Sequence, residues 1–126
     1  MSDLPHANTS EIDEFRKIAQ SGADGPVFML NLNKYNPEAA FPDGRLYKDY
    51  MAALDTLLSQ VGGKILWRTQ VLGQVVGAQD IDEAIGIRYP THQAFLALMT
   101  APASSENMRL RALAVAHADL HRCAAY

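Results

Sequence analysis

The sequence has few of the features that mark a disulfide scaffold or a membrane protein. Its 126 residues include one cysteine, Cys123, which excludes an internal disulfide and agrees with a reducing compartment. The longest apolar runs, such as AFLALM over 94–99, are far shorter than the roughly 18 residues of a membrane-spanning helix. The polar start MSDLPHANTS lacks the basic and apolar parts of a secretory signal. We therefore expect a cytoplasmic protein with no membrane partner.

An excess of positive charge is also absent. The chain has 11 lysines and arginines against 14 aspartates and glutamates, a formal net charge of −3. Arg109, Arg111 and Arg122 are interleaved with apolar residues and form no basic stripe, so we expect no nucleic-acid partner. What remains, 48% hydrophobic and 20% charged residues in a chain of single-domain length, is typical of a globular domain with its own core.

The beginning of the chain predicts a leader and a helix ahead of the main domain. Ser10 and Asp13 resemble a capping box, apolar residues follow at helical spacing, and Gly22 ends the segment. An apolar run begins just after Gly25-Pro26. We therefore divide the chain into a leader with its helix, residues 1–25, and one domain, residues 26–126.

Hydrophobic periodicity predicts the elements of this domain. Both alternating sets in VFMLNLN, residues 27–33, are largely apolar, which indicates a strand covered on both faces. A loop rich in proline and turn formers follows over 35–44, and apolar steps of three and four residues predict a helix over 46–61. The remaining predicted elements are strands over 64–72 and 83–89, a short helix from Pro90-Thr91 to Pro102, a second helix capped by Ser104-Ser105 and reaching Ala114, and a last strand around 118–126.

The order after the first helix is β-α-β-β-α-β, the α+β pattern of ferredoxin-like domains. In that fold the helices cover one face of the sheet. The strands, however, carry apolar residues on both faces, and a monomer does not leave an apolar patch larger than a few hundred Å² in water. A second copy of the sheet is the simplest cover, so we predict a homodimer closed sheet against sheet.

Several motifs in this domain resemble those of one bacterial family. They are LNLNK over 30–34, GRLYKDY with Gly44, Tyr47 and Tyr50, then Gly62-Gly63, RYP over 88–90, and Arg111 ahead of the last strand. In order and spacing they are similar, over about residues 26–123, to the family of domains of unknown function numbered 1330, in the dimeric α/β-barrel superfamily.

The resemblance implies a ferredoxin-like protomer that pairs into a barrel. The superfamily includes cofactor-free monooxygenases, haem-degrading enzymes, polyketide cyclases and regulatory ligand-binding domains, and this family implies no particular reaction. The added N-terminal helix and the extended loop over 35–43 depart from its simple pattern. They leave open which relative the pocket resembles.

Polar residues that interrupt the apolar strands are the candidate ligand-binding groups. They are Asn31 and Asn33 in the first strand, Arg68 and Gln70 in the second, Arg88 in the third, and Asp119, His121 and Cys123 in the last. On one side of the sheet they would give an apolar cleft the few polar groups that orient a small molecule. The alternative is that the sheet register places them on different faces, since a shift of one residue reverses the face.

Aromatic residues supply further candidates. Tyr47 and Tyr50 lie one turn apart on the predicted helix 46–61, where each can bury its ring and keep its hydroxyl for a ligand or for water at the cleft rim. We favour packing as their main role. Trp67, the single tryptophan, lies among strand hydrophobes, where core packing and a place in a pocket wall are compatible.

Metal and cofactor sites are not expected. His117 and His121 are four residues apart in a predicted strand, a separation of about 13 Å that is too long for one ion. The glycines of GQVVG do not fit a phosphate-binding loop, and no G-x-S-x-G motif is present. We expect Cys123 to be a small buried hydrophobe. His121, next in pattern to Asp119, is a candidate general base.

Two functions agree with these features. One is a cofactor-independent enzyme for a small, partly hydrophobic, oxygen-bearing molecule, with Asn31, Asn33 and Arg88 orienting polar atoms. His121 or Tyr50 would then transfer protons. The other is a non-catalytic dimeric domain that binds a metabolite in the same cleft. A titratable group of strongly perturbed pKa in the deepest pocket would favour the enzyme. A third alternative is a dimer without a ligand, in which the protein's own side chains fill the cleft.

Overall fold

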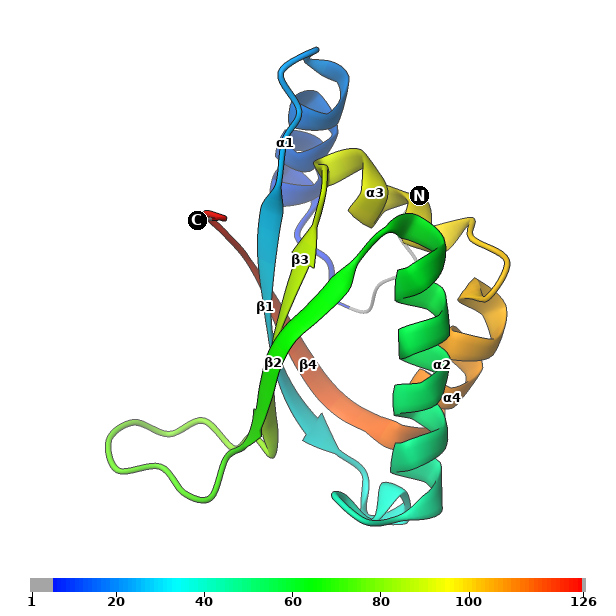
Figure 1. The fold of residues 1–126 in the computed structure, drawn as a ribbon. Coiled ribbons are helices and arrows are strands. Elements are labelled where there is room, and N and C mark those ends of the chain that lie inside the picture. The colour runs from blue at the N-terminus through cyan, green and yellow to red at the C-terminus, as the bar shows by residue number, and fades with distance from the viewer. Residues whose placement is uncertain (1–5, 126) are drawn as a thin grey trace.

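The computed structural model describes residues 6–125, which form a four-stranded sheet with helices packed on one face (Figure 1). The strands are β1 (Val27–Tyr35), β2 (Lys64–Gln70), β3 (Glu83–Tyr89) and β4 (Val115–Cys123). The helices are α1 (Thr9–Gln20), α2 (Arg45–Val61), α3 (His92–Leu96) and α4 (Ser104–Ala114), with 3₁₀ turns at Pro37–Ala39 and Ala97–Met99.

The sheet has the order β2-β3-β1-β4, and every neighbouring pair is antiparallel. With α2 between β1 and β2, and α3 and α4 between β3 and β4, this is the ferredoxin-like arrangement. The predicted α+β protomer with an extra N-terminal helix is therefore confirmed. Within residues 6–125, no helix has the length and apolarity that crossing a membrane requires.

Helix α2 begins and ends where the sequence predicts. Gly44 is its N-cap, and Gly62 adopts the left-handed conformation at its end, with φ 80°. The Gly63 amide then donates to the Leu58 carbonyl at 2.9 Å, which satisfies a carbonyl of the last turn. Chain direction therefore reverses directly into β2.

Two predicted helix caps are wrong. Helix α1 begins at Thr9 behind Asn8, without a side-chain cap, so Ser10 lies inside the helix. Helix α4 has Ala103 as its N-cap, and Ser104 is buried within the first turn. In both cases the N-cap residue, Asn8 or Ala103, precedes the serine that was predicted to cap the helix.

The strand register divides the sheet residues into two faces. The helix-facing residues of β1 are Val27, Met29, Asn31, Asn33 and Tyr35, and those of the opposite face are Phe28, Leu30, Leu32 and Lys34. Residues directly opposite each other in an antiparallel pair share a face. Asn31 pairs with Ile85 and Leu120, whereas Leu30 pairs with Gly86 and His121. Asn31 and Asn33 therefore share the helix side with Met29, as predicted.

The opposite face of the sheet, termed the outer face, has no helix over it in Figure 1. It comprises Phe28, Leu30 and Leu32 of β1, Trp67 of β2, Gly86 and Arg88 of β3, and His121 of β4. Phe28 and Trp67 meet edge to face over Gly86, where a Cβ atom would lie only 2.7 Å from each ring. Trp67 remains 45% exposed. Glycine at this position makes room for the aromatic pair, and the patch they form stays open to solvent in one protomer.

Helix α1 joins the rest of the fold through α3. The ring of Phe15 packs against His92 and Phe95 at centroid distances of 4.8 and 4.9 Å. Arg122 of β4 forms an ion pair with Glu11. These contacts hold α1 along the helix side of the sheet, so it does not cover the outer face.

The connection between β2 and β3, residues 71–82, projects from the body of the molecule as a long arm (Figure 1). Its base is closed by a hydrogen bond from the Val71 amide to the Asp82 carbonyl at 2.8 Å. Leu72, Val75 and Val76 on the arm are at least 86% exposed. The arm therefore takes no part in the core.

Candidate functional site

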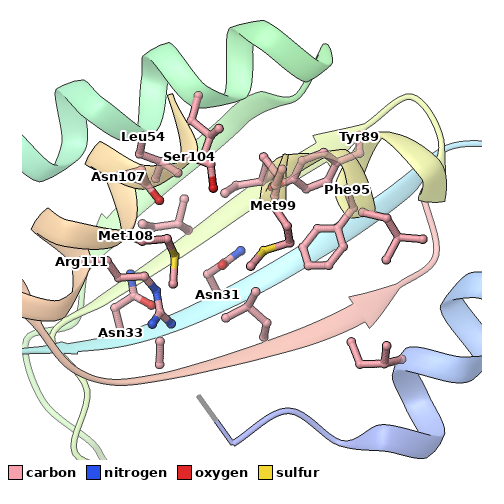
Figure 2. A pocket seen from close by; sticks show the side chains of 18 of the residues that line it. Asn31, Asn33, Leu54, Tyr89, Phe95, Met99, Ser104, Asn107, Met108 and Arg111 are labelled. Carbon is pink, nitrogen blue, oxygen red and sulfur yellow. The ribbon is translucent and has the colours of Figure 1, made fainter. Parts of the chain in front are cut away.

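A cavity of about 350 Å³ lies between the helix-facing side of the sheet and helices α1 to α4 (Figure 2). Its apolar wall includes Leu54, Leu57, Ile85, Ile87, Phe95 and Met99. A volume near 300 Å³ or above is the size of a small-molecule pocket. The space thus lies between the sheet and the helices of one protomer.

Several elements contribute polar side chains to the wall of this cavity. They include Asn31 and Asn33 of β1, Tyr50 of α2, and Ser104, Asn107 and Arg111 of α4, together with Arg16 and Gln20 of α1 and Gln93 of α3. Figure 2 shows Asn107 and Arg111 on α4 across from Asn31 and Asn33 on the strand. Two-residue spacing on a strand and four-residue spacing on a helix each place side chains on one face, which is why these groups converge.

The two strand asparagines are each held by one internal hydrogen bond. Asn31 Nδ2 donates to the Met29 carbonyl at 3.1 Å, and Asn33 Nδ2 donates to the Tyr35 hydroxyl at 3.1 Å. These bonds orient both amides. They leave the cavity with fixed polar groups on its sheet side.

Asn107 is the exception among the polar groups. Its side chain is 4% exposed, and Nδ2 has no hydrogen-bond partner among the described residues. A buried donor without an acceptor costs about 1–3 kcal/mol, so native proteins rarely retain one. The Asn107 amide is therefore a donor that a ligand or a water in the cavity would satisfy.

Tyr50 and Arg111 form a pair at the cavity wall. Burial raises the pKa of the Tyr50 hydroxyl, while the charge and hydrogen bond of Arg111 act to lower it. The net shift is upward, so Tyr50 stays protonated at neutral pH. Within residues 6–125, Arg111 has no carboxylate within 4.0 Å. Its only strong interaction is thus with a neutral hydroxyl.

A buried carboxylate network lies directly behind Asn33. The Tyr35 hydroxyl donates to Glu83 Oε1 at 2.6 Å, and the Tyr47 hydroxyl lies 2.9 Å from Oε2. Glu83 itself is 3% exposed. Burial, followed by the hydrogen bonds to Glu83, raises the pKa of Tyr47, so Tyr47 remains a donor. Arg68 Nη1 lies 3.5 Å from the Tyr47 hydroxyl.

Some of the ligand-binding residues predicted from sequence line the cavity, and others lie outside it. Asn31 and Asn33, with the predicted proton donor Tyr50, line the cavity. Tyr47 and Arg68 do not line it and belong to the Glu83 network. The strand register brings Asn31 and Asn33 to the same side as Arg68, which pairs with Ile85.

Trp67, Arg88 and His121 lie on the outer face, away from this cavity. His121 borders a second, smaller hollow of about 220 Å³ beside α1. Asp119, its expected companion, instead pairs with His117, at 3.1 Å from Oδ1 to Nε2. The structure does not bring His121 and Tyr50 to one site. No group of three or more His, Cys, Asp or Glu residues placed to hold a metal occurs within residues 6–125.

The polar residues that α4 contributes to the cavity were not predicted from the sequence. Ser104, Asn107 and Arg111 follow at steps of three and four residues, the spacing of one helix face. This polar stripe is a signal in the sequence, but a polar helix face ordinarily faces solvent. Only the position of α4 over the sheet turns it inward.

Comparison with known proteins supports the fold and gives no reaction. No protein-family model matches the chain, and no curated protein matches it. The crystal structure of the RPA0582 protein of unknown function from Rhodopseudomonas palustris is similar, with 26% identity and a TM-score of 0.74. That match spans 97% of this chain and 96% of the other, so it reaches α1.

More distant structures share the fold alone. A dabb family protein from Mesorhizobium loti, with a ferredoxin-like fold, has 12% identity and a TM-score of 0.58 over 81% of this chain and 98% of its own. A dimeric ferredoxin-like protein of unknown function from Thermobifida fusca has 16% identity and a TM-score of 0.54, over 80% and 92%. These similarities show the ferredoxin-like fold alone.

Proposed function

We propose that this protein binds a small, partly hydrophobic, oxygen-bearing metabolite in the cavity beneath α4. The observation that carries this proposal is the unsatisfied Asn107 amide in a largely apolar space of about 350 Å³. Asn107 lines that space, and its Nδ2 has no hydrogen-bond partner among the described residues. A ligand with an oxygen near Asn107 and an apolar body would match both features.

Binding without catalysis is the function that the polar groups support best. A general base needs a pKa near the working pH, whereas the pKa of Tyr50 is raised away from it. His121, the other proton-transfer candidate, lies on the outer face. Within the cavity, the titratable groups therefore hold and orient a ligand.

The Tyr50–Arg111 pair supports a second candidate, a cofactor-independent enzyme. A protonated hydroxyl beside a guanidinium can stabilise negative charge developing on a carbonyl oxygen. Tyr50 also meets the expectation of a titratable group with a shifted pKa in the cavity wall. Conversion of a bound compound, lost in Tyr50→Phe while binding persists, would favour this candidate.

We also propose that two copies of the protein associate through the outer face to form a homodimer. This assembly would be cytoplasmic and would resemble that of the family of domains of unknown function numbered 1330. The exposed Phe28–Trp67 patch supports this assembly. Two structural neighbours, from Thermobifida fusca and Bacteroides fragilis, are described as dimeric. Pairing of this kind would leave the cavity on the far side of each sheet, so each copy would bind its own ligand. Residues 1–25 remain the proposed leader of the domain 26–126.

The test of binding is a thermal-shift screen of the purified protein against small aromatic and aliphatic alcohols, amides and carboxylic acids. A ligand present at about a hundred times its Kd stabilises the folded state by about 2.7 kcal/mol, which raises Tm by roughly 10 °C. The absence of a shift across such a set would count against the proposal.

The variant Asn31→Leu tests whether a ligand found in the thermal-shift screen binds in the cavity. It removes an oriented amide from the sheet side, and we expect it to weaken binding of a screen hit by about tenfold, the loss of one good hydrogen bond. Asn36→Leu is the matched control, because Asn36 also donates one side-chain hydrogen bond to a backbone carbonyl but does not line the cavity. Titration calorimetry measures both. Equal affinity in the two variants would remove Asn31 from the site.

A further inference from the structure

We propose that the ligand of this cavity is a small carboxylic acid bound in its ionised form, with Arg111 and Asn107 of α4 holding the carboxylate. This inference rests on the proposed function, because it names the chemical class that the same cavity takes.

The charge of the cavity wall is one-sided. Arg16 and Arg111 line it, and none of the described lining residues is an aspartate or a glutamate. Arg16 belongs to α1, where it lies 4.0 Å from Asp13. Arg111 is half-buried and interacts with the Tyr50 hydroxyl, and no carboxylate of the described residues forms an ion pair with it. Removing a cation from water without a counter-charge is costly, and an anionic ligand would supply that counter-charge.

The hydrogen-bonding groups around Arg111 are mostly donors. Asn107 lies one turn before it on α4, and its Nδ2 has no acceptor. The Tyr50 hydroxyl interacts with the guanidinium, so its own proton stays available to a ligand oxygen. Figure 2 shows Arg111 and Asn107 on successive turns of α4. A carboxylate has two oxygens that accept several hydrogen bonds and matches the forked geometry of a guanidinium.

The rest of the cavity limits what is attached to that carboxylate. Leu54, Leu57, Phe95 and Met99 surround the remaining space, so the body of the acid is apolar. One guanidinium in a mostly apolar pocket suits a single negative charge better than the two of a phosphate monoester, whose second charge would be desolvated without a partner. An aliphatic or aromatic monocarboxylic acid therefore fits best.

The experiment compares acids with neutral molecules of the same shape. Titration calorimetry at neutral pH measures binding of phenylacetate, phenylacetamide and phenylethanol, and of octanoate, octanamide and octanol. We expect the better of the two acids to bind the wild-type protein at least about tenfold more tightly than its amide and its alcohol. Arg111→Gln should remove that preference, weakening the acid by about tenfold more than its neutral analogues.

Arg109→Gln is the matched control. Arg109 lies on the same helix, is exposed, and pairs with Glu106 at 2.8 Å, so its loss should leave all six affinities unchanged. Circular dichroism and Tm show whether Arg111→Gln folds. If it does not, Asn107→Asp takes its place: a carboxylate beside Arg111 would compete with the acid, so binding of the acid should weaken by at least about tenfold more than binding of the alcohol.

The outcomes separate the two proposals. Equal binding of an acid and its alcohol by the wild-type protein would overturn the carboxylate and leave small-molecule binding intact. An acid preference that survives in Arg111→Gln, or in Asn107→Asp where that variant stands in, would also overturn it. Binding of none of the six compounds would count against the proposed function as well, which the wider thermal-shift screen tests independently.

Discussion

Glu83 shows how much one residue contributes at the level of side-chain contacts. The first residue of β3 is a carboxylate that is 3% exposed and receives hydrogen bonds from Tyr35 and Tyr47. A buried charge persists only where such donors surround it. Phe41 packs against both tyrosine rings, which keeps water away. The network therefore depends on one acceptor.

Glu83→Ala should lower the free energy of unfolding by about 3 kcal/mol, because it leaves the two tyrosine hydroxyls buried without their acceptor. Glu83→Gln keeps one acceptor oxygen and should cost less. Urea denaturation monitored by circular dichroism measures both. Glu38→Ala, at an exposed glutamate, is the control and should change stability by no more than about 0.5 kcal/mol. Similar losses in Glu83→Ala and Glu38→Ala would show that the network contributes nothing.

Residue identity alone did not reveal this role. In the sequence, Glu83 follows the turn-rich segment AQDID, where a glutamate is ordinarily exposed. Its burial results from its pairing with Asn33 on β1 and Gln70 on β2, partners distant along the chain. Tyr47 was expected at the cleft rim. Its hydroxyl instead donates a hydrogen bond to Glu83, because the fold brings these two distant residues together.

At the scale of elements, α3 depends on a cap supplied by a distant loop. Asp24, just before β1, accepts hydrogen bonds from the His92 and Gln93 amides at 2.8 and 3.0 Å and lies 2.9 Å from His92 Nδ1. Burial acts to raise the pKa of Asp24, but these hydrogen bonds together lower it. The contacts join the loop after α1 to the start of α3. They thereby position Phe95 at the cavity.

Asp24→Ala should destabilise the protein by about 1–2 kcal/mol at neutral pH, the usual cost of losing a helix cap. The difference from wild type should depend on pH. Because the pKa of Asp24 is lower in the folded state, its stabilisation is complete above its unfolded pKa and is lost as the pH falls through the folded pKa. Urea unfolding across the acidic range measures this. Asp55→Ala, at an exposed position of α2, should show no such dependence, and a pH-independent difference for Asp24→Ala would contradict the assignment.

Most elements could be predicted because their signals are local. The apolar steps of α2 and the glycines that follow it are within one segment, and β3 has the predicted bounds. The caps of α1 and α4 could not be predicted from Ser10 and Ser104, because a helix begins where tertiary packing turns the chain. The residues of α4 do not divide clearly into an apolar and a polar face. The sequence therefore gave no indication that Ser104, Asn107 and Arg111 face the cavity.

At the scale of the whole molecule, the outer face carries apolar residues that no helix of the protomer covers. Leu30 lies at its centre, opposite Gly86 on one side and His121 on the other. Leu32 and the Phe28–Trp67 pair extend the patch along the sheet. A partner sheet packed at this position would complete a closed core.

Leu30→Lys should convert the proposed homodimer to a monomer. A lysine without a counter-charge in an apolar interface costs about 3 kcal/mol or more, which weakens the dimer Kd by roughly a hundredfold. Size-exclusion chromatography with light scattering at micromolar concentration measures the change. Leu113→Lys, at a half-exposed position of α4 outside the outer face, is the control and should remain dimeric. A monomeric wild-type protein would refute the sheet-to-sheet assembly.

The sequence by itself determined the succession of helices and strands, since capping glycines and hydrophobic periods act over a few neighbouring residues. It also placed Asn31 and Asn33 on one face of β1, because alternation is a property of any strand. Only the tertiary structure decided what meets those asparagines. Strand register sent Arg88 and His121 to the outer face, and the placement of α4 over the sheet brought Arg111 and Asn107 into the cavity, because contacts between distant segments depend on how the whole chain packs.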